Sequence, residues 1–223
     1  MTLNKYSKVL TVILVILIIL SIIGIGFLIY NTVIKPKKDE GRAIEAIEEF
    51  DRQVENNDEE DQEENIESNV DMNLIKHTDK PKHKRKKKVY YNNYVMIGYI
   101  TIPKTNVKEP ILDIVTPDSL NNAVAVIYPS VPKLNEPGNN VIIGHNYRNN
   151  KFFSNNDKLT VGDTLRIKDT TGRELTYTIY QKFETTPEDT SFYNRDTKGA
   201  VEVTLSTCTD DSKARIIILA KVE

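Results

Sequence analysis

The sequence predicts a mostly β domain of about eight short strands, preceded by an apolar helix long enough to cross a membrane. Residues 9–30 contain no charged side chain and consist mainly of Ile, Leu and Val. Beyond residue 95 the chain breaks into short apolar or alternating runs separated by Pro, Gly and Asn, which is typical of a β-barrel or a β-sandwich. Between these parts lies a highly charged segment with little apolar area to bury. The 223 residues therefore predict one folded domain with an N-terminal accessory region.

The apolar run is expected to be an uncleaved membrane anchor over residues 9–34, after a short polar tail of residues 1–8. The uncharged stretch covers about 33 Å as a helix, enough for the hydrocarbon core of a bilayer. It is longer than the apolar core of a signal peptide, and the following NTVIK offers no small-residue cleavage site. Lysines flank the span on both sides, so the positive-inside rule does not orient it.

Residues 35–88 are expected to form a charged, largely disordered stalk that the chemistry of the domain does not need. Acidic side chains dominate residues 39–71, and residues 80–88 read KPKHKRKKK. Blocks of this kind stay solvated and extended. The apolar side chains at 44, 47, 50 and 54 lie at roughly helical spacing, which allows an amphipathic turn or two. The basic run lacks interleaved aromatics and accompanies no nucleic-acid-binding fold, so no nucleic-acid partner is expected.

The folded domain is expected over residues 89–223. Residues 174–183 alternate, with Leu175, Tyr177, Ile179 and Phe183 on one face. Residues 214–222 are almost entirely apolar, which is typical of a strand buried on both faces. The other strands are expected at residues 96–102, 111–115, 123–128, 141–144, 164–168 and 201–206, and short helices only at 118–122 and 149–159.

A single cysteine, Cys208, closes the run TLSTC at the end of a predicted strand. One cysteine cannot form an intramolecular disulfide, and no His/Cys cluster with zinc-ligand spacing accompanies it, so no metal site is expected. A free cysteine is most often a small buried hydrophobe. Cys208, however, shares its strand phase with Thr204 and Ser206, on the less apolar face, which favours a reactive thiol.

His145 and Arg215 are the candidate partners of this thiol. His145 follows the apolar strand 141–144 and is the only histidine of the folded domain, so it is the only histidine that could serve as a base. Arg215 opens the last strand, and its guanidinium could stabilise a thiolate and hold an oxyanion. The plain alternatives are a solvated loop histidine and an arginine paired with Asp210 or Asp211.

Taken together, these motifs resemble the active-site signature of the sortases over residues 97–223. The resemblance rests on TLSTC followed seven residues later by an arginine, on GHN after an earlier strand, and on the opening strand GYITIP. It implies a closed eight-stranded sortase-type β-barrel, with Cys208 as nucleophile, His145 as general acid and base, and Arg215 at the oxyanion. It also implies a single-pass cell-membrane protein with a cytoplasmic N-terminus and an extracellular catalytic domain.

The activity that the resemblance implies is transpeptidation. The substrate is then a surface protein with a C-terminal LPxTG-like sorting signal, and the acceptor is an amine of a lipid-linked cell-wall precursor or a pilin subunit. This chemistry needs no cofactor. Thr207, Phe192 and Tyr193 are the expected substrate contacts, although the two aromatics could equally pin their loop to the barrel. A cysteine peptidase with water as acceptor and a non-catalytic envelope scaffold are the open alternatives.

The motifs leave the sortase subclass open. GHN and TLSTC are similar to class B sortases, which carry a long helical insertion between the sixth and seventh strands. Residues 184–199 are too short for that insertion and resemble classes A, D or E. No lid motif of the class C type occurs before residue 95. The compact loop favours an LPxTG-like signal over the NPQTN-like signal of class B.

Overall fold

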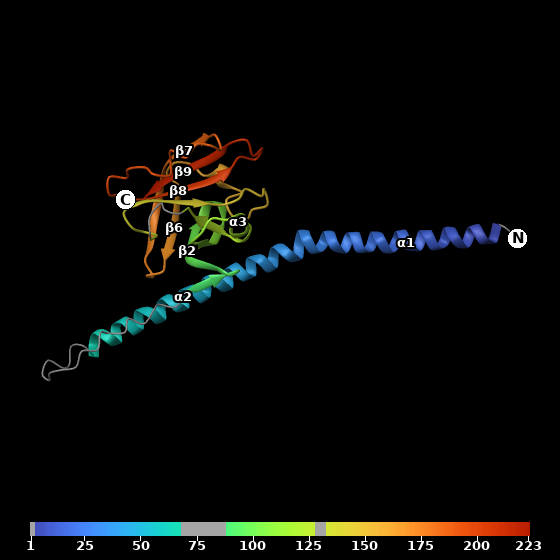
Figure 1. The fold of residues 1–223 in the computed structure, drawn as a ribbon, viewed down its shortest axis with the longest axis horizontal. Coiled ribbons are helices and arrows are strands. Elements are labelled where there is room, and N and C mark those ends of the chain that lie inside the picture. Colours follow the sequence, from blue (N-terminus) through green and yellow to red (C-terminus); the bar gives the residue numbers. More distant parts are fainter. Residues whose placement is uncertain (1–2, 68–87, 128–132) are drawn as a thin grey trace. The chain divides into compact units, whose positions relative to one another are not determined.

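The structure is a computed structural model that describes residues 3–67, 88–127 and 133–223, so the basic run at 80–87 lies outside the described residues. The chain divides into two compact units, Met1–Glu45 and Ala46–Glu223. The first unit holds helix α1 (Leu3–Ile29), the short π-helix η1 (Tyr30–Ile34) and the beginning of helix α2 (Lys35–Glu67), all drawn in blue in Figure 1. Its apolar side chains from Val9 to Ile34 are exposed. Among the described residues, this is the one helical region long and apolar enough to cross a membrane.

The second unit is built around a closed eight-stranded barrel, which confirms the predicted fold class. The strands follow the order β2-β3-β4-β5-β8-β9-β7-β6, and β6 pairs back onto β2 to close the ring (Figure 1). Two neighbouring pairs, β3–β4 and β5–β8, are parallel, and the others are antiparallel. The strands are β1 (Val89–Tyr91), β2 (Tyr94–Ile102), β3 (Val107–Leu112), β4 (Val124–Val126), β5 (Gly138–Ile143), β6 (Thr164–Asp169), β7 (Glu174–Thr185), β8 (Val201–Cys208) and β9 (Arg215–Lys221).

The strand β1 was not predicted, and one predicted helix is wrong. β1 forms a hairpin with β2 through Asn92 and Asn93, whose positive φ angles of 46° and 69° suit a tight hairpin turn. The helix expected over residues 149–159 is replaced by turns and the short 3-10 helix η3 (Asn156–Lys158), because Asn150 and Phe152 adopt positive φ angles of 67° and 51°. The other predicted helix is confirmed as α3 (Pro117–Asn122), and a 3-10 turn η2 (Pro103–Thr105) follows β2.

Both faces of the sheet around β8 and β9 are covered. Val203 and Leu205 point into the barrel, and the alternate residues Thr204 and Ser206 point outward but are also buried. In β9 the inward and outward side chains from Ile216 to Ala220 are all aliphatic, as its continuous apolar run predicted. The barrel interior collects the aliphatic and aromatic side chains of all eight strands, among them Ile100, Ile111, Val124, Ile142, Leu165, Tyr177, Leu205 and Ile218.

One side chain of β7 faces the opposite way from its prediction. Tyr177 and Ile179 pack in the barrel interior, whereas Phe183 packs with the outer cluster beside Ile217. The pairing of β7 with β9 shifts register between Ile179 and Gln181, so an extra residue enters the strand there. A β-bulge of this kind reverses the inside–outside phase of everything that follows it. The alternation in the sequence therefore holds only up to the bulge.

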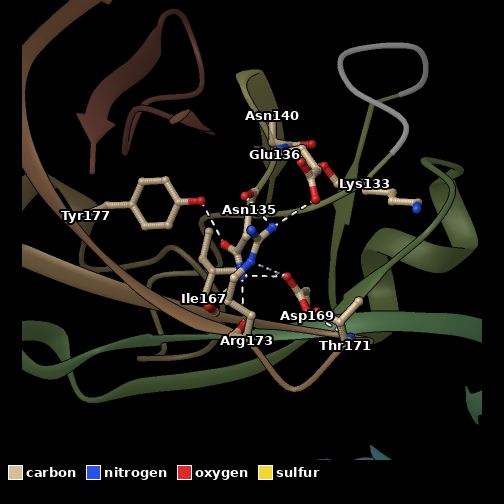
Figure 2. Close-up of polar contacts among 9 residues, drawn as sticks. All are labelled: Lys133, Asn135, Glu136, Asn140, Ile167, Asp169, Thr171, Arg173 and Tyr177. Atoms are coloured by element: carbon tan, nitrogen blue, oxygen red, sulfur yellow. Dashed lines mark hydrogen bonds and ion pairs between the residues drawn. The ribbon is translucent and has the colours of Figure 1, made fainter. Parts of the chain in front are cut away.

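A buried polar cluster fixes the chain that leads into β5 (Figure 2). Asn135 has a left-handed φ of 60°, and its side-chain amide donates to the Ile167 carbonyl at 3.1 Å, the Asp169 carboxylate at 3.0 Å and the Arg173 carbonyl at 2.9 Å. Its side-chain oxygen accepts from the Tyr177 hydroxyl at 2.8 Å, and burial raises the pKa of that tyrosine. These bonds fasten the start of β5 to the β6–β7 hairpin. The residues directly before β5 are therefore held in one position against β6 and β7.

The charged segment after the span is not disordered over its first part, contrary to the expectation for residues 35–88. Lys35–Glu67 form helix α2, and Ile47, Phe50 and Val54 are buried in a cluster with Val89, Met96 and Tyr99 of β1 and β2. The apolar side chains recur every three or four residues, so a single stripe of an otherwise charged helix is covered. The compact unit consequently begins at Ala46, well before the predicted boundary at residue 89.

Polar contacts support the same packing. Asp51 of α2 forms an ion pair with Lys168 of β6, with 2.8 Å between Oδ1 and Nζ. The Tyr99 hydroxyl donates to the other carboxylate oxygen at 3.4 Å, and burial together with this negative charge raises the pKa of Tyr99 to about 12. The Phe50 and Tyr99 rings meet edge to face, with centroids 6.0 Å apart. These contacts make the second half of α2 part of the barrel unit.

Replacement of Phe50 by alanine is therefore expected to destabilise the barrel. Phe50 is 1% exposed, and removal of a buried phenylalanine side chain typically costs about 3–5 kcal/mol. Chemical denaturation of the full chain in detergent measures the free energy of unfolding. Ile44→Ala is the matched control, because Ile44 lies on the same helix but is 46% exposed, and such changes stay within about 0.5 kcal/mol. Equal stability of the two variants contradicts the packing of α2 on the barrel.

Candidate active site

The ends of β5 and β8 lie side by side because the two strands pair in parallel. Ile143 is opposite Ser206, and the Gly144 amide donates to the Ser206 carbonyl at 3.2 Å. His145 and Cys208, which are separated by 63 positions in the sequence, each follow two residues after this last pair of the ladder. The parallel pairing thus brings the two predicted catalytic residues to one end of the barrel.

Gly144 allows β5 to end in this position. A Cβ atom on residue 144 would lie 2.7 Å from the Phe153 side chain and 2.9 Å from the Val124 side chain, closer than real contacts permit. Only glycine therefore lets the backbone approach Phe153 and Val124 while the next residue remains at the surface. The glycine of the GHN motif thus has a packing role directly before the histidine.

Arg215 contacts the thiol directly. Cys208 and Arg215 are cross-strand partners at the first position of the β8–β9 pairing, and the Arg215 guanidinium donates from Nη1 to the Cys208 sulfur at 3.0 Å. Both side chains are half-buried. Among the described residues Arg215 forms no ion pair with Asp210 or Asp211, which make other contacts. The guanidinium is therefore directed at the sulfur, where a charged donor can stabilise a thiolate.

The electrostatic surroundings favour a neutral His145. The imidazole is half-buried, and this burial together with the positive charge of Arg215 lowers the pKa of His145 below its ordinary value of 6.5. A neutral imidazole at pH 7 can take up a proton from a thiol or an incoming amine. Three side chains from the ends of β5, β8 and β9 therefore meet in one site.

Asn146 links the histidine segment to the cysteine strand, a role that the sequence analysis missed. Its side-chain amide donates to the Cys208 carbonyl at 3.0 Å and to the Asp210 carboxylate at 2.9 Å. Its side-chain oxygen accepts from the Arg148 amide at 3.1 Å. The asparagine of GHN was noted only as a family motif, although a polar residue directly after the candidate histidine was the available signal. Its bonds hold the ends of the two strands together beyond the regular ladder.

Two of the predicted substrate contacts are buried by the protein itself. Phe192, in the β7–β8 loop, is 2% exposed and packs on the outer face of the sheet against Val141, Ile217 and Leu219. Thr207 is 1% exposed and alternates with Cys208 along β8, so its side chain faces away from the thiol. For Phe192 this placement supports the alternative in which the aromatic pins its loop to the barrel.

Tyr193 keeps part of its surface free and remains the candidate substrate contact of the loop. Its ring is half-buried and meets the Phe192 ring at a right angle, with centroids 4.6 Å apart. It packs at the edge of the outer cluster, together with Phe183 and Ile143. Its backbone carbonyl accepts from the Asn139 side chain near the start of β5, whereas His145 follows the end of that strand.

A polar network that was not predicted fastens the β7–β8 loop to the sheet. The Arg195 guanidinium pairs with the Glu202 carboxylate at 2.7 Å, and the same carboxylate accepts from the Tyr180 hydroxyl at 2.7 Å. The Asn139 side-chain amide donates to the Phe192 carbonyl at 2.9 Å, and its oxygen accepts from the Thr204 hydroxyl at 2.8 Å. The ion pair and these hydrogen bonds thus hold the loop that carries Tyr193 against the sheet.

No group of three or more His, Cys, Asp or Glu side chains that could hold a metal ion occurs among the described residues. The chemistry available to the site is that of its thiol, imidazole and guanidinium. This combination is suited to acyl transfer through a thioester, because it supplies a nucleophile, a proton carrier and a donor for a developing oxyanion.

Comparison with known proteins agrees with this chemistry. The Sortase domain family matches residues 100–223. A sortase D5 transpeptidase of Clostridium perfringens is 30% identical, with 82% of this chain and 99% of that chain covered and a TM-score of 0.59. The sortase C1 of Streptococcus agalactiae, solved in complex with MTSET, is 27% identical over 57% of this chain and 69% of that chain, with a TM-score of 0.53.

A third solved structure, the sortase C-1 of Actinomyces oris, is 25% identical over 56% of this chain and 72% of that chain, with a TM-score of 0.52. A search of curated proteins finds no match. The matches to solved structures include sortases described as C1, A and D5, so they do not assign a subclass.

Proposed function

Because this chain belongs to the sortase family and is a cysteine transpeptidase, we propose that it cleaves the sorting signal of an exported protein and transfers that protein to an amine. The proposed signal is LPxTG-like. The proposed acceptor is an amine of a lipid-linked cell-wall precursor or of a pilin subunit. The proposed location is the cell membrane, with α1 as a single span, the N-terminus in the cytoplasm and the barrel outside. The exposed apolar surface of α1 supports the membrane anchor.

In the proposed first step, the Cys208 sulfur attacks the carbonyl carbon of the residue before the scissile bond. His145 takes the thiol proton, and the new bond between sulfur and carbon gives a tetrahedral oxyanion that the Arg215 guanidinium stabilises. The bond between carbon and nitrogen then breaks, and His145 gives its proton to the leaving amine. The products are a thioacyl enzyme and the released C-terminal fragment.

In the second step, the acceptor amine attacks the thioester carbonyl. Neutral His145 takes a proton from the amine, the bond between carbon and sulfur breaks, and the proton passes to the departing thiolate. The observation that carries the proposal is the 3.0 Å contact between Arg215 Nη1 and Cys208 Sγ, next to the strand end that bears His145. A guanidinium in contact with the sulfur is also close to the oxygen of a carbonyl under attack.

The test is turnover of peptides by the full chain in detergent, with and without a small amine such as hydroxylamine. Intact-mass spectrometry after an acid quench detects the thioacyl enzyme, and chromatography separates amide from acid products. We expect an LPxTG-like peptide to exceed NPQTN-like and SPKTG-like peptides, and the amine to divert the product to amide. If the carboxylic acid is the sole product at every amine concentration, the protein is a peptidase with water as acceptor. If no thioacyl enzyme forms, the protein is a non-catalytic scaffold. Preference for the NPQTN-like peptide contradicts the argument from the compact β7–β8 loop.

A further inference from the structure

Among the residues that the structure describes, no third group of the kind that usually orients a catalytic histidine contacts the His145 imidazole through a hydrogen bond. In catalytic triads a hydrogen bond to the second ring nitrogen fixes the orientation of the imidazole. Within residues 3–67, 88–127 and 133–223, no hydrogen bond to the His145 ring is formed. A side chain that rotates freely would approach the thiol and the substrate amine only part of the time. Some other contact must therefore hold the ring.

The contact is the aromatic ring of Tyr147. The rings of His145 and Tyr147 are in contact in a tilted arrangement, with centroids 4.8 Å apart and planes inclined by 32°. We propose that Tyr147, tethered through its hydroxyl to Asn121, is a positioning residue that holds the His145 imidazole in its working orientation. This inference rests on the proposed function, because it assigns the orientation of the histidine in the same acyl transfer.

Tyr147 is held firmly for a residue that is 43% exposed. Its hydroxyl donates to the Asn121 side-chain oxygen at 2.7 Å, and its backbone amide donates to the Ser154 hydroxyl at 3.1 Å. Its ring also lies 5.8 Å from the ring of buried Phe152. An exposed tyrosine without a role in the site has no need for contacts on three sides. Here the contacts fix the ring that the imidazole packs against.

Asn121 provides a rigid point for the tether. It lies in α3, whose start is fixed by a capping box in which Thr116 and Ser119 exchange hydrogen bonds of 2.8 and 2.9 Å. The helix leads within a few residues into β4, which pairs with β5. Asn121 lies shortly before β4 and His145 shortly after β5, so the pairing of these two strands fixes the positions of both residues. The hydrogen bond joins Asn121, between β3 and β4, to Tyr147, which follows β5, and the Tyr147 ring contacts His145.

Among the described groups, Arg215 of β9 acts on the imidazole through its positive charge, and Tyr147 contacts it from the same segment. Cys208 of β8 accepts a hydrogen bond from Arg215. Asp210, after β8, is engaged by Asn146 and lies 3.9 Å from Arg148, and Asp118 of α3 accepts from the Tyr94 hydroxyl. Burial is the larger cause of the lowered pKa of His145, and the positive charge of Arg215 is the second. The Tyr147 ring packs against the imidazole and contributes to its burial, so its removal should return the pKa of His145 toward 6.5.

The experiment compares Tyr147→Leu, Tyr147→Phe and Asn121→Ala in the full chain in detergent. With an LPxTG-like peptide, Tyr147→Leu should lower kcat by about 10–100-fold with little change in KM, because the loss is one of orientation. Tyr147→Phe keeps the ring and loses one hydrogen bond, so a loss of about 2–10-fold is expected. Asn121→Ala should match Tyr147→Phe, and the double variant should lose no more than either, since both remove the same bond.

A second readout is independent of peptide turnover. NMR titration of histidine side chains labelled with ¹⁵N should show a higher pKa for His145 in Tyr147→Leu than in the wild type and in Tyr147→Phe. Tyr90→Ala is the matched control, because Tyr90 is a 59% exposed tyrosine of β1 outside the site, and it should change neither kcat nor the titration. If the wild type forms no thioacyl enzyme, the proposed function fails, and the titration still tests the positioning role.

Two results would overturn the inference. One is a Tyr147→Leu variant with kcat within about twofold of wild type, a change no larger than the loss of a weak hydrogen bond. The other is an unchanged His145 titration in that variant. If Tyr147→Leu does not fold, Tyr147→Phe and Asn121→Ala remain as the test, and wild-type kcat in both variants rejects the tether.

Discussion

Cys208→Ala is expected to abolish formation of the thioacyl enzyme and to leave the barrel folded. The substitution removes one sulfur atom at the end of β8, where the Cys208 side chain is half-buried and its sulfur accepts a hydrogen bond from Arg215. Without a sulfur nucleophile there is no covalent intermediate, so neither amide nor acid product should form from an LPxTG-like peptide. Intact-mass spectrometry measures the intermediate, and thermal unfolding measures the stability.

The control for this prediction is a variant, Cys208→Ser, that changes the nucleophile but keeps a polar atom at this position. Cys208→Ser keeps an acceptor beside Arg215, but a hydroxyl gives far less anion than a thiol near neutral pH, so turnover should stay below detection as well. Clear cleavage by the alanine variant shows that another group attacks the peptide. A large fall in the unfolding temperature of the alanine variant shows instead that the sulfur has a packing role.

The local pattern of the sequence carried much of the fold, because each of the eight barrel strands overlaps a range that the apolar and alternating runs predicted. Cys208 was predicted on the less apolar phase of its strand, and the structure has Thr204 and Ser206 on that outer face. The bulge in β7 could not be predicted, since an extra residue shifts the register without changing the residue types. Phe183 was therefore predicted on the same face as Tyr177 but packs in the outer cluster.

The site depended on information that local pattern does not contain. The approach of His145 to Cys208 follows from the parallel pairing of β5 with β8, a contact between segments more than 60 residues apart. Sequence reasoning grouped the two residues by chemistry and by resemblance to a family. It could not give the contacts of Asn146 and Tyr147, because these depend on where the segment after β5 turns relative to β8 and α3.

The charged segment shows how composition can hide structure. Acidic residues dominate residues 39–71, and the average over this stretch predicts an extended chain. Three apolar side chains at helical spacing were nevertheless enough to cover β1 and β2 once those strands were present. The stripe gains its stability from the barrel and not from the helix itself, which is why its packing could not be judged from the segment alone.

His145→Ala is expected to lower kcat/KM for an LPxTG-like peptide by about 10²–10⁴-fold, the usual contribution of a positioned acid and base. Arg215→Ala should cost about 10²–10³-fold through loss of the oxyanion donor. Because both residues are assigned to the same step, the double variant should lose much less than the product of the two effects. Arg215→Lys should recover only part of the loss, since an ammonium cannot reproduce the planar guanidinium.

The pH dependence gives this prediction a second measurement. The pKa of His145 lies below 6.5, so its neutral form, which accepts the proton of the incoming amine, is lost as the pH falls through that lowered pKa. The aminolysis rate at saturating peptide should therefore fall with acidification in the wild type, and this limb should be missing in His145→Ala. A fully active Arg215→Lys variant contradicts the oxyanion role, because a positive charge alone would then be sufficient. Fully multiplicative losses in the double variant contradict the assignment of both residues to one step.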